Sequence, residues 1–137
     1  MAFSRCSPRV GVTAPSGGLY GGGLSGPNNA LMNYGGPPLW ISWTLLKQAD
    51  GTYAFQTTSG YILTANAGGV PGAGFRTDTA TDQIGNREKF TLVDNGDFTA
   101  HIKTHVGTYL RATGSEIRSV TDVSNATRWR FWVFSPP

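Results

Sequence analysis

Residues 90–97 read FTLVDNGD, and the first four of them repeat the pattern of residues 43–46 (WTLL) at a distance of 47 positions. The same offset relates residues 102–107 (IKTHVG) to residues 55–60 (FQTTSG). A constant offset over so many positions indicates one structural unit that is used more than once. The internal repeat therefore points to the fold before any single residue points to a function.

Each copy has the alternation of short β-strands. In residues 41–45 (ISWTL), apolar side chains occupy every second position, which is the period of a strand with one buried face. Residues 52–57 follow the Asp-Gly pair at 50–51, and residues 99–104 follow the Asn-Gly pair at 95–96. These dipeptides are typical of tight hairpins. We therefore expect an all-β chain of short strands and turns.

The pattern extends to both ends of the chain. Residues 129–134 (WRFWVF) place Phe131 where Phe90 stands one unit earlier, at a shorter spacing of 41 positions. Residues 12–17 (VTAPSG) align more loosely with residues 55–60. Three units of about four short strands each would account for the whole length. We predict a single domain, 1–137, with approximate repeats at 1–48, 49–95 and 96–137.

Residues 82–97 (DQIGNREKFTLVDNGD) and 104–110 (THVGTYL) resemble the repeat of fascin-like β-trefoil domains. That repeat runs IG-x-W-E-x-F, then VDNGD, then T-x-x-G-x-YL. Arg87 stands where the family has Trp, and Trp40 fills the matching position one unit earlier. The resemblance is good over residues 50–134 and poor before residue 40. The Gln-x-Trp signature of ricin-type trefoil lectins is absent from the sequence.

The resemblance implies a β-trefoil, in which three hairpins close a six-stranded barrel and three more cap it. Trp43, Phe90 and Phe131 would then be equivalent rings in one layer of the core. The layer beside it is expected to contain Leu45, Leu92 and Val133. Closure of the barrel would remove the sheet edges that invite aggregation.

Residues 14–38 are rich in Gly and Pro, a composition that sustains neither a long helix nor a long strand. We interpret this stretch as an enlarged loop in the first repeat. Long loops on rigid frames often bind partners, and they are also where insertions are tolerated. The sequence leaves both interpretations open.

The composition is that of a globular chain with little charge. The chain has 137 residues, of which 39% are hydrophobic and 14% charged, and its net charge is +3. Its basic residues are scattered, which argues against nucleic-acid binding. Cys6 is the only cysteine, so no intrachain disulfide forms. No signal peptide or membrane span is recognisable, and we expect a cytoplasmic protein or a component of an assembly, without membrane insertion.

The polar residues do not form a recognisable catalytic or metal site. His101 and His105 would lie about 13 Å apart on an extended strand, too far to share one metal ion, and we expect them to face solvent. Asp50, Asp94 and Asp97 fall at hairpin turns, where Asp is favoured for local hydrogen bonds. No Gly-x-Ser-x-Gly nucleophile elbow occurs. We predict a protein that is not an enzyme and needs no cofactor or metal.

Aromatic residues on the outside of the strands favour carbohydrate binding. A flat ring stacks on the C–H face of a sugar, and nearby Asn and Asp side chains bond its hydroxyl groups. The candidate ligand-binding residues are Trp40, Trp132, Tyr20, Tyr34, Asn28, Asn29, Asp78, Asp82 and Asn86. We predict a non-catalytic, lectin-like module, with Trp40 and Trp132 packed beneath loops as the structural alternative.

Two further functions stay open at this stage. One is a structural or protein-interaction role, either actin-binding like fascin or as a surface or docking subunit of a larger assembly such as a virion. The other is protease inhibition, with residues 14–38 as the reactive segment. The expected partner is accordingly a glycan or a protein surface, and the sequence does not define an oligomeric state.

Overall fold

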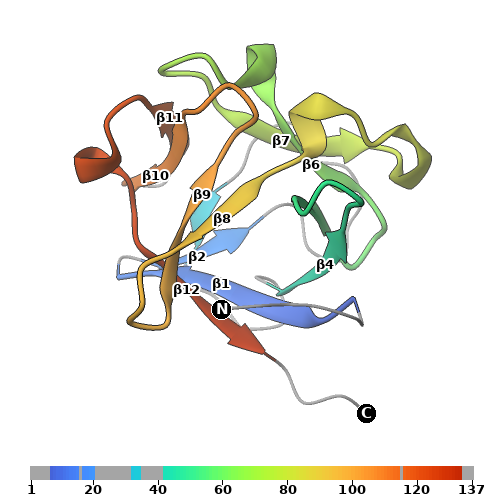
Figure 1. Ribbon diagram of the computed structural model, residues 1–137, viewed down its shortest axis with the longest axis horizontal. Coiled ribbons are helices and arrows are strands. Elements are labelled where there is room, and N and C mark those ends of the chain that lie inside the picture. Colours follow the sequence, from blue (N-terminus) through green and yellow to red (C-terminus); the bar gives the residue numbers. More distant parts are fainter. Residues whose placement is uncertain (1–6, 16, 21–31, 35–41, 115, 134–137) are drawn as a thin grey trace.

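The computed structural model describes residues 7–15, 17–20, 32–34, 42–114 and 116–133. Within these residues the secondary structure consists of β-strands and short 3₁₀ turns, with no α-helix (Figure 1). No helix in the described part of the chain has the length and apolarity needed to cross a membrane. The all-β class expected from the alternation is confirmed.

Within the described residues, twelve strands form one continuous sheet. In chain order the strands are β1 (Arg9–Ala14), β2 (Gly17–Tyr20), β3 (Met32–Tyr34), β4 (Ser42–Lys47), β5 (Tyr53–Gln56), β6 (Ile62–Ala65), β7 (Phe75–Thr79), β8 (Thr91–Asp94), β9 (Thr99–Lys103), β10 (Tyr109–Thr113), β11 (Glu116–Val120) and β12 (Trp129–Val133). The 3₁₀ turns are η2 (Asn66–Gly69), η3 (Thr81–Gln83), η4 (Asn86–Glu88) and η5 (Val123–Asn125).

The strand pairings follow one scheme three times. β1 pairs with β12, β2 and β4. β5 pairs with β4 and β6, and a bridge from Tyr53 to Phe90 joins it to the start of β8. β9 pairs with β8, β10 and β12. In each case the first strand of a unit pairs with the last strand of the preceding unit and with the second and fourth strands of its own.

These pairings define a β-trefoil. β1, β4, β5, β8, β9 and β12 close a barrel, because β12 returns to pair with β1. The hairpins β2–β3, β6–β7 and β10–β11 cap it. Closure satisfies the backbone groups that an open barrel edge would leave exposed. The fold expected from the repeated sequence is confirmed.

The register of the strands identifies the equivalent core rings. In each unit one ring lies opposite the first strand, and the pairs are Val10 with Trp43, Tyr53 with Phe90, and Ala100 with Trp129. Trp129, 39 positions after Phe90, is therefore the third equivalent ring. The expectation that Phe131 holds this place is wrong by two positions. A two-residue shift preserves the alternation of buried and exposed positions, so the sequence pattern does not reveal it.

Trp43 and Trp129 make the same hydrogen bond, which supports their equivalence. Trp43 Nε1 donates to Leu19 O at 3.0 Å, and Trp129 Nε1 donates to Leu110 O at 3.3 Å. Both rings are fully buried, and a buried indole N–H needs an acceptor. Phe90 fills the same place in the second unit without an N–H group. The three rings therefore share one structural role.

Phe131 belongs to the neighbouring layer of the core. The cross-strand pairs of this layer are Val12 with Phe131, Phe55 with Leu45, and Ile102 with Leu92. Val133 was expected here, and that expectation is wrong because its side chain is 60% exposed. The register aligns Val133 with Lys47 and Asp94, which end β4 and β8, so it lies at the strand end beyond the packed layers.

Phe55 joins rings of different units in the centre of the core. Its ring meets Trp43 edge-on at a centroid distance of 6.0 Å and Phe90 at 5.7 Å, and it tilts toward Phe131 at 6.3 Å. Burial of each such side chain contributes about 1.5–3 kcal/mol relative to leaving it exposed. All three units therefore depend on one shared core.

Two short strands interrupt the loop expected in the Gly/Pro-rich stretch 14–38. β2 and β3 pair with each other through Gly18 and Tyr34, and Leu19 of β2 is fully buried. Pairing with neighbouring strands and burial of Leu19 outweigh the low strand propensity of Gly. The other residues of this stretch, apart from Ala14 and Pro15, lie outside the described part of the chain.

Candidate functional site

Trp132 lies on the outside of the barrel. Its side chain is 53% exposed, so it is not packed beneath a loop. Trp132 Nε1 donates to Thr13 Oγ1 at 2.8 Å, and the guanidinium carbon of Arg130 lies 5.5 Å from the ring centroid. The hydrogen bond and the cation–π contact fix the orientation of the ring. The result is a rigid aromatic surface that faces solvent.

The predicted polar partners of Trp132 lie elsewhere. Asp82 is in η3 and Asn86 is in η4, and both are exposed. The backbone position of Asp78 is in β7, which Figure 1 shows on the opposite side of the molecule from the tip of β12. These three residues are therefore not brought together with Trp132.

The remaining predicted ligand residues belong to the first unit. Tyr20 ends β2 and Tyr34 ends β3, and their backbone positions lie in one hairpin. Trp40, Asn28 and Asn29 lie outside the described residues, as does most of the segment suggested as an inhibitor loop.

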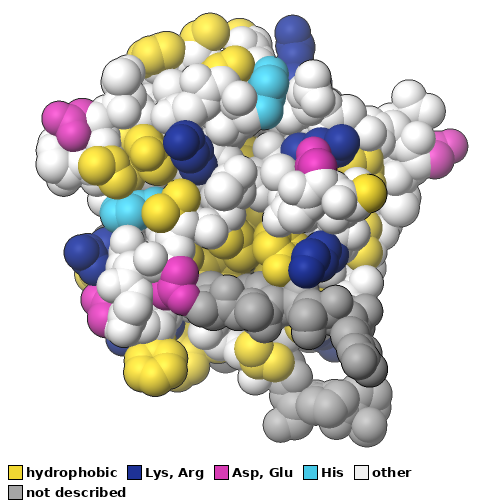
Figure 2. All heavy atoms as spheres, in the orientation of Figure 1, with side chains coloured by type: hydrophobic (Ala, Val, Ile, Leu, Met, Phe, Trp, Pro, Cys, Tyr) yellow, Lys and Arg dark blue, Asp and Glu magenta, His cyan; other side chains and the backbone are white. Residues whose placement is uncertain are grey.

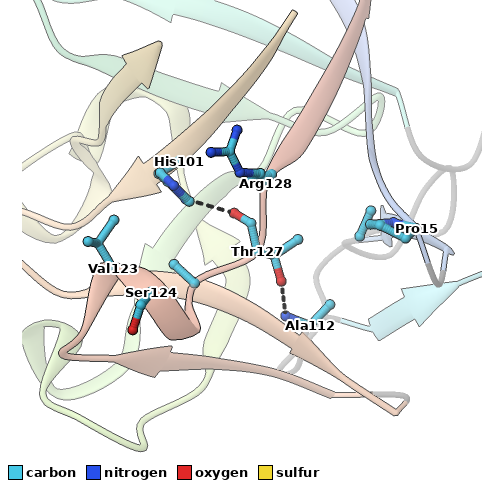
Figure 3. A pocket seen from close by; sticks show the side chains of 9 residues that line it. Pro15, His101, Ala112, Val123, Ser124, Thr127 and Arg128 are labelled. Atoms are coloured by element: carbon cyan, nitrogen blue, oxygen red, sulfur yellow. Dashed lines mark hydrogen bonds between the residues drawn. The ribbon is translucent and has the colours of Figure 1, made fainter. Parts of the chain in front are cut away.

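A pocket of 680 Å³ opens between the third unit and the turn that follows β1 (Figure 3). The end of β1, strands β9 and β10, and the segment leading into β12 form its walls. The lining residues are Ala14, Pro15, His101, Ala112, Val123, Ser124, Ala126, Thr127 and Arg128. None of the ligand residues predicted from the sequence is among them. Small apolar side chains supply most of the wall, and a few polar groups converge on it.

His101 is the buried polar residue of the pocket. It is 7% exposed, so the expectation that it faces solvent is wrong. Its strand position lies outside the barrel, between the core residues Ala100 and Ile102, but the segment before β12 covers it. The ring also meets Tyr109 edge-on at a centroid distance of 5.9 Å.

Thr127 fixes the orientation of the His101 ring. His101 Nδ1 lies 3.0 Å from Thr127 O, and because a carbonyl only accepts, Nδ1 carries the hydrogen (Figure 3). Thr127 Oγ1 in turn accepts from Ala112 N at 2.9 Å. Among the described residues, no group hydrogen-bonds His101 Nε2. In the neutral imidazole Nε2 is therefore an acceptor without a described partner.

Arg128 stands at the rim of the pocket and is paired with a carboxylate. Arg128 Nη1 donates to Asp97 Oδ2 at 3.1 Å. Asp97 also accepts from Thr99 Oγ1 and, at 3.2 Å, from Thr99 N. The Thr99 hydroxyl is the largest cause that holds the pKa of Asp97 below its ordinary value, and the charge of Arg128 adds to it. The pair is exposed, so it contributes little to stability.

The charged side chains on the visible face are dispersed rather than gathered in a stripe (Figure 2). Across residues 7–15, 17–20, 32–34, 42–114 and 116–133, no group of three His, Cys, Asp or Glu residues is placed to hold a metal ion. His105, the second histidine, is exposed in the turn after β9.

Sequence reasoning missed the pocket because its walls come from both ends of the chain. The linear pattern shows which residues alternate in a strand but not which segment covers the strand from outside. One signal was available: His101 stands at the position that Gly11 and Ala54 occupy in the other two units. A large polar residue at a place where the repeat otherwise keeps small ones marks a local departure from the common scheme.

No protein-family model and no curated protein matches this chain. Among solved structures, the designed three-fold symmetric protein ThreeFoil is 20% identical with a TM-score of 0.72, over 90% of this chain and 97% of its own. SeviL bound to asialo-GM1 saccharide is 13% identical with a TM-score of 0.68, over 91% of this chain and 96% of its own.

The exo-β-1,3-galactanase 1,3Gal43A from Clostridium thermocellum is 17% identical with a TM-score of 0.78. The match covers 96% of this chain but 31% of the galactanase. At these identities, the three likenesses show the β-trefoil fold alone.

Proposed function

We propose that this chain is a non-catalytic carbohydrate-binding module of the fascin-like type of β-trefoil. The observation that carries this proposal is Trp132, an aromatic ring that is 53% exposed and yet held in place. A ring fixed by Thr13 and Arg130 loses little conformational freedom when a ligand stacks on it, so more of the contact energy appears as affinity. Stacking on the C–H face of a sugar is a contact that such a ring provides.

The structural neighbours support the proposal at the level of the fold. SeviL was solved bound to the asialo-GM1 saccharide, and the galactanase takes its name from a polysaccharide. One fold serves many functions, so the proposal depends on Trp132 and not on these likenesses.

The buried carboxylate Glu88 has a structural contact, which argues against a catalytic role for it. Among the carboxylates whose side chains the structure describes, Glu88 is the buried one. Its Oε1 accepts a hydrogen bond from Gly85 N at 2.8 Å, which closes the turn at η4. Glycoside hydrolysis uses two facing carboxylates, and Glu88 is engaged in a structural contact instead.

A glycan array tests the proposal. The wild-type protein is expected to bind at least one class of glycan, and Trp132→Ala is expected to lose that binding while it stays folded. Val106→Ala is the matched control, because Val106 is also 53% exposed and belongs to the turn before β10. An array without signal at high protein concentration, or equal binding by Trp132→Ala and the wild type, would contradict the proposal.

A protein-docking role is the second candidate, and one observation favours it. Phe98, Trp132 and Val133 are 79%, 53% and 60% exposed. Phe98 precedes β9, which pairs with β12, so these apolar side chains belong to neighbouring segments. Light scattering after size exclusion and pull-down with the wild type and with Phe98→Ser test this role. A monomer without a captured partner argues against docking, whereas an assembly that Phe98→Ser dissolves supports it.

A further inference from the structure

We infer that the pocket beside His101 is a second saccharide subsite, distinct from the Trp132 surface. It takes one neutral, hydroxyl-bearing sugar ring whose hydroxyl group donates a hydrogen bond to His101 Nε2. The inference rests on the proposed carbohydrate-binding function and adds to it the place and the chemical class of the bound residue.

His101 Nε2 is the polar atom of the pocket that a ligand would hydrogen-bond. Its side chain is more than nine-tenths buried and lines the pocket. Its Nδ1–H is used by Thr127 O, and no described residue hydrogen-bonds Nε2. A buried acceptor without a partner is costly, so native structures rarely leave one unpaired. A hydroxyl donor in the pocket satisfies it.

The size and the walls of the pocket suit a sugar ring. Its 680 Å³ lies in the range of small-molecule sites. The side chains of Pro15, Ala112, Val123 and Ala126 offer apolar surface to C–H groups, whereas His101 and Ser124 offer hydrogen bonds. Ala126 adds little bulk to the wall, whereas the corresponding position in the second unit holds the larger Arg87.

The hydrogen-bonding groups select a neutral ligand over an acid. Arg128 uses Nη1 for Asp97, and the carboxylate offsets its positive charge. The other N–H groups of the guanidinium remain donors, and His101 Nε2 is an acceptor. A donor and an acceptor that line one pocket match adjacent hydroxyl groups, each of which both donates and accepts. Against the neutral imidazole, a ligand carboxylate would place negative charge beside the lone pair of Nε2.

The pocket is separate from the Trp132 surface. Arg128 and Trp132 are four residues apart along the segment of β12, which corresponds to about 13 Å of extended chain. The cross-strand pairs of β1 with β12 include Thr13 with Arg130, between these two positions. The two places are therefore close enough to serve one oligosaccharide and far enough apart to be tested separately.

A nitrogen-15 NMR titration of the folded protein tests the inference. The probes are the methyl glycosides of glucose, galactose and mannose, with glucuronate as the charged comparison, each raised to millimolar excess. At least one neutral glycoside is expected to shift the His101 imidazole signals, and glucuronate is expected to leave them unchanged. The Trp132 indole signal reports the other surface in the same spectra.

Two substitutions at His101 separate recognition from folding. His101→Asn places an amide near Nδ1, keeps the bond to Thr127 O and removes the acceptor at Nε2. His101→Gln places an amide oxygen near the position of Nε2. We expect His101→Asn to weaken the neutral glycoside about 10-fold, the loss typical of one hydrogen bond to a buried group, and His101→Gln to weaken it less. Ala126→Phe, which fills the pocket with a phenyl ring, is expected to abolish the shift of the His101 signals that the glycoside causes.

The outcomes distinguish the two proposals. NMR shifts of the Trp132 signal without shifts of the His101 signals would contradict the saccharide subsite at the pocket, but not the carbohydrate-binding function. Equal affinities of the wild type, His101→Asn and Ala126→Phe would also overturn the pocket, as would a preference for glucuronate. Silence at both sites would contradict the proposed function together with the pocket.

Discussion

The inner and outer faces of the barrel strands follow different rules. On the inner face, Trp43, Phe90 and Trp129 occupy equivalent places and are all buried. On the outer face, the places equivalent to Trp132 hold Leu46 and Val93. The inner places therefore hold large rings in all three units, whereas the outer places hold a ring in one. The repeated interior specifies the fold, and departures from the repeat mark the places where function is to be sought.

The hairpin turns show the same contrast at closer range. Thr52 bonds Asp50, which pairs with Lys89 at 3.6 Å. Thr99 bonds Asp97 in the same way, and Arg128 pairs with Asp97 at 3.1 Å. The turn is thus repeated, and in the third unit its cation, Arg128, also lines a pocket with a buried histidine. The cation that pairs with the turn carboxylate is therefore also part of the candidate site in the third unit.

The largest expected effect concerns the inner ring. Trp129→Ala is expected to lower the free energy of unfolding by about 3–5 kcal/mol, because it leaves a cavity where a fully buried indole packs. Val133→Ala, at a position 60% exposed, is expected to change it by less than about 0.5 kcal/mol. Urea unfolding of both variants measures the difference. Similar losses of stability for the two variants would contradict the assignment of Trp129 to the core layer of Trp43 and Phe90.

Two glycines sharpen the comparison between a packed turn and an open one. Gly69 has a φ of +91°, and a Cβ added there would lie 2.8 Å from Thr104 Oγ1. Gly69→Ala is therefore expected to cost about 2–5 kcal/mol, from left-handed strain and overpacking together. Gly51→Ala shares the strain, with a φ of +87°, but meets nothing within 4 Å, and about 1–2 kcal/mol is expected. Equal losses in thermal unfolding would show that the contact of Gly69 with the third unit is unimportant.

Replacing an inner indole by a phenyl ring should have a smaller effect. Trp43→Phe and Trp129→Phe are each expected to cost about 1–3 kcal/mol, since each removes the indole hydrogen bond to a leucine carbonyl. The losses should be similar, because the two rings are equivalent and Phe90 shows that a phenyl ring fits the layer. A loss confined to one of the two in urea unfolding would contradict the equivalence.

The repeated turns predict a modest acid sensitivity of stability. Hydrogen bonds from Thr52 and Thr99 hold the pKa values of Asp50 and Asp97 below the ordinary 3.8. A carboxylate whose pKa is lowered by folding stabilises the protein above pH 3.8, and this stabilisation is lost as the pH falls through the folded-state value.

Melting temperatures between pH 2 and pH 6 check this prediction. Asp50→Asn and Asp97→Asn should each flatten the acid-side decline, whereas Asp82→Asn, at an exposed site in η3, serves as the control. Identical profiles for the wild type and the Asp97→Asn variant would show that the turn bond of Asp97 does not contribute.

Much of the fold could be predicted from the repeat because the units place the same types of side chain in the core. The offset of 47 positions aligned Trp43 with Phe90 correctly. It failed at Phe131, because the third unit is shorter and a shift of two residues preserves the strand period. The strands β2 and β3 were hidden by a Gly-rich composition that pairing overrides.

Less of the candidate site could be predicted. The alternation in β12 correctly placed Trp132 on the outside, because that statement needs only one strand. The same reasoning placed His101 outside the barrel but could not show that the segment ending at Thr127 covers it. Asp82 and Asn86 were grouped with Trp132 by chemical type alone, and the chain path separates them.

The most direct measurement is a crystal structure of the protein soaked with a glycan that binds in solution. It shows whether the glycan binds at the third unit, where the outer surface differs from that of the other two units. Sugar density is expected against Trp132 and in the pocket of His101, and none at the corresponding positions of Leu46 and Val93. Density at all three equivalent positions, or density only away from the third unit, would contradict the view that this module acts through its third unit.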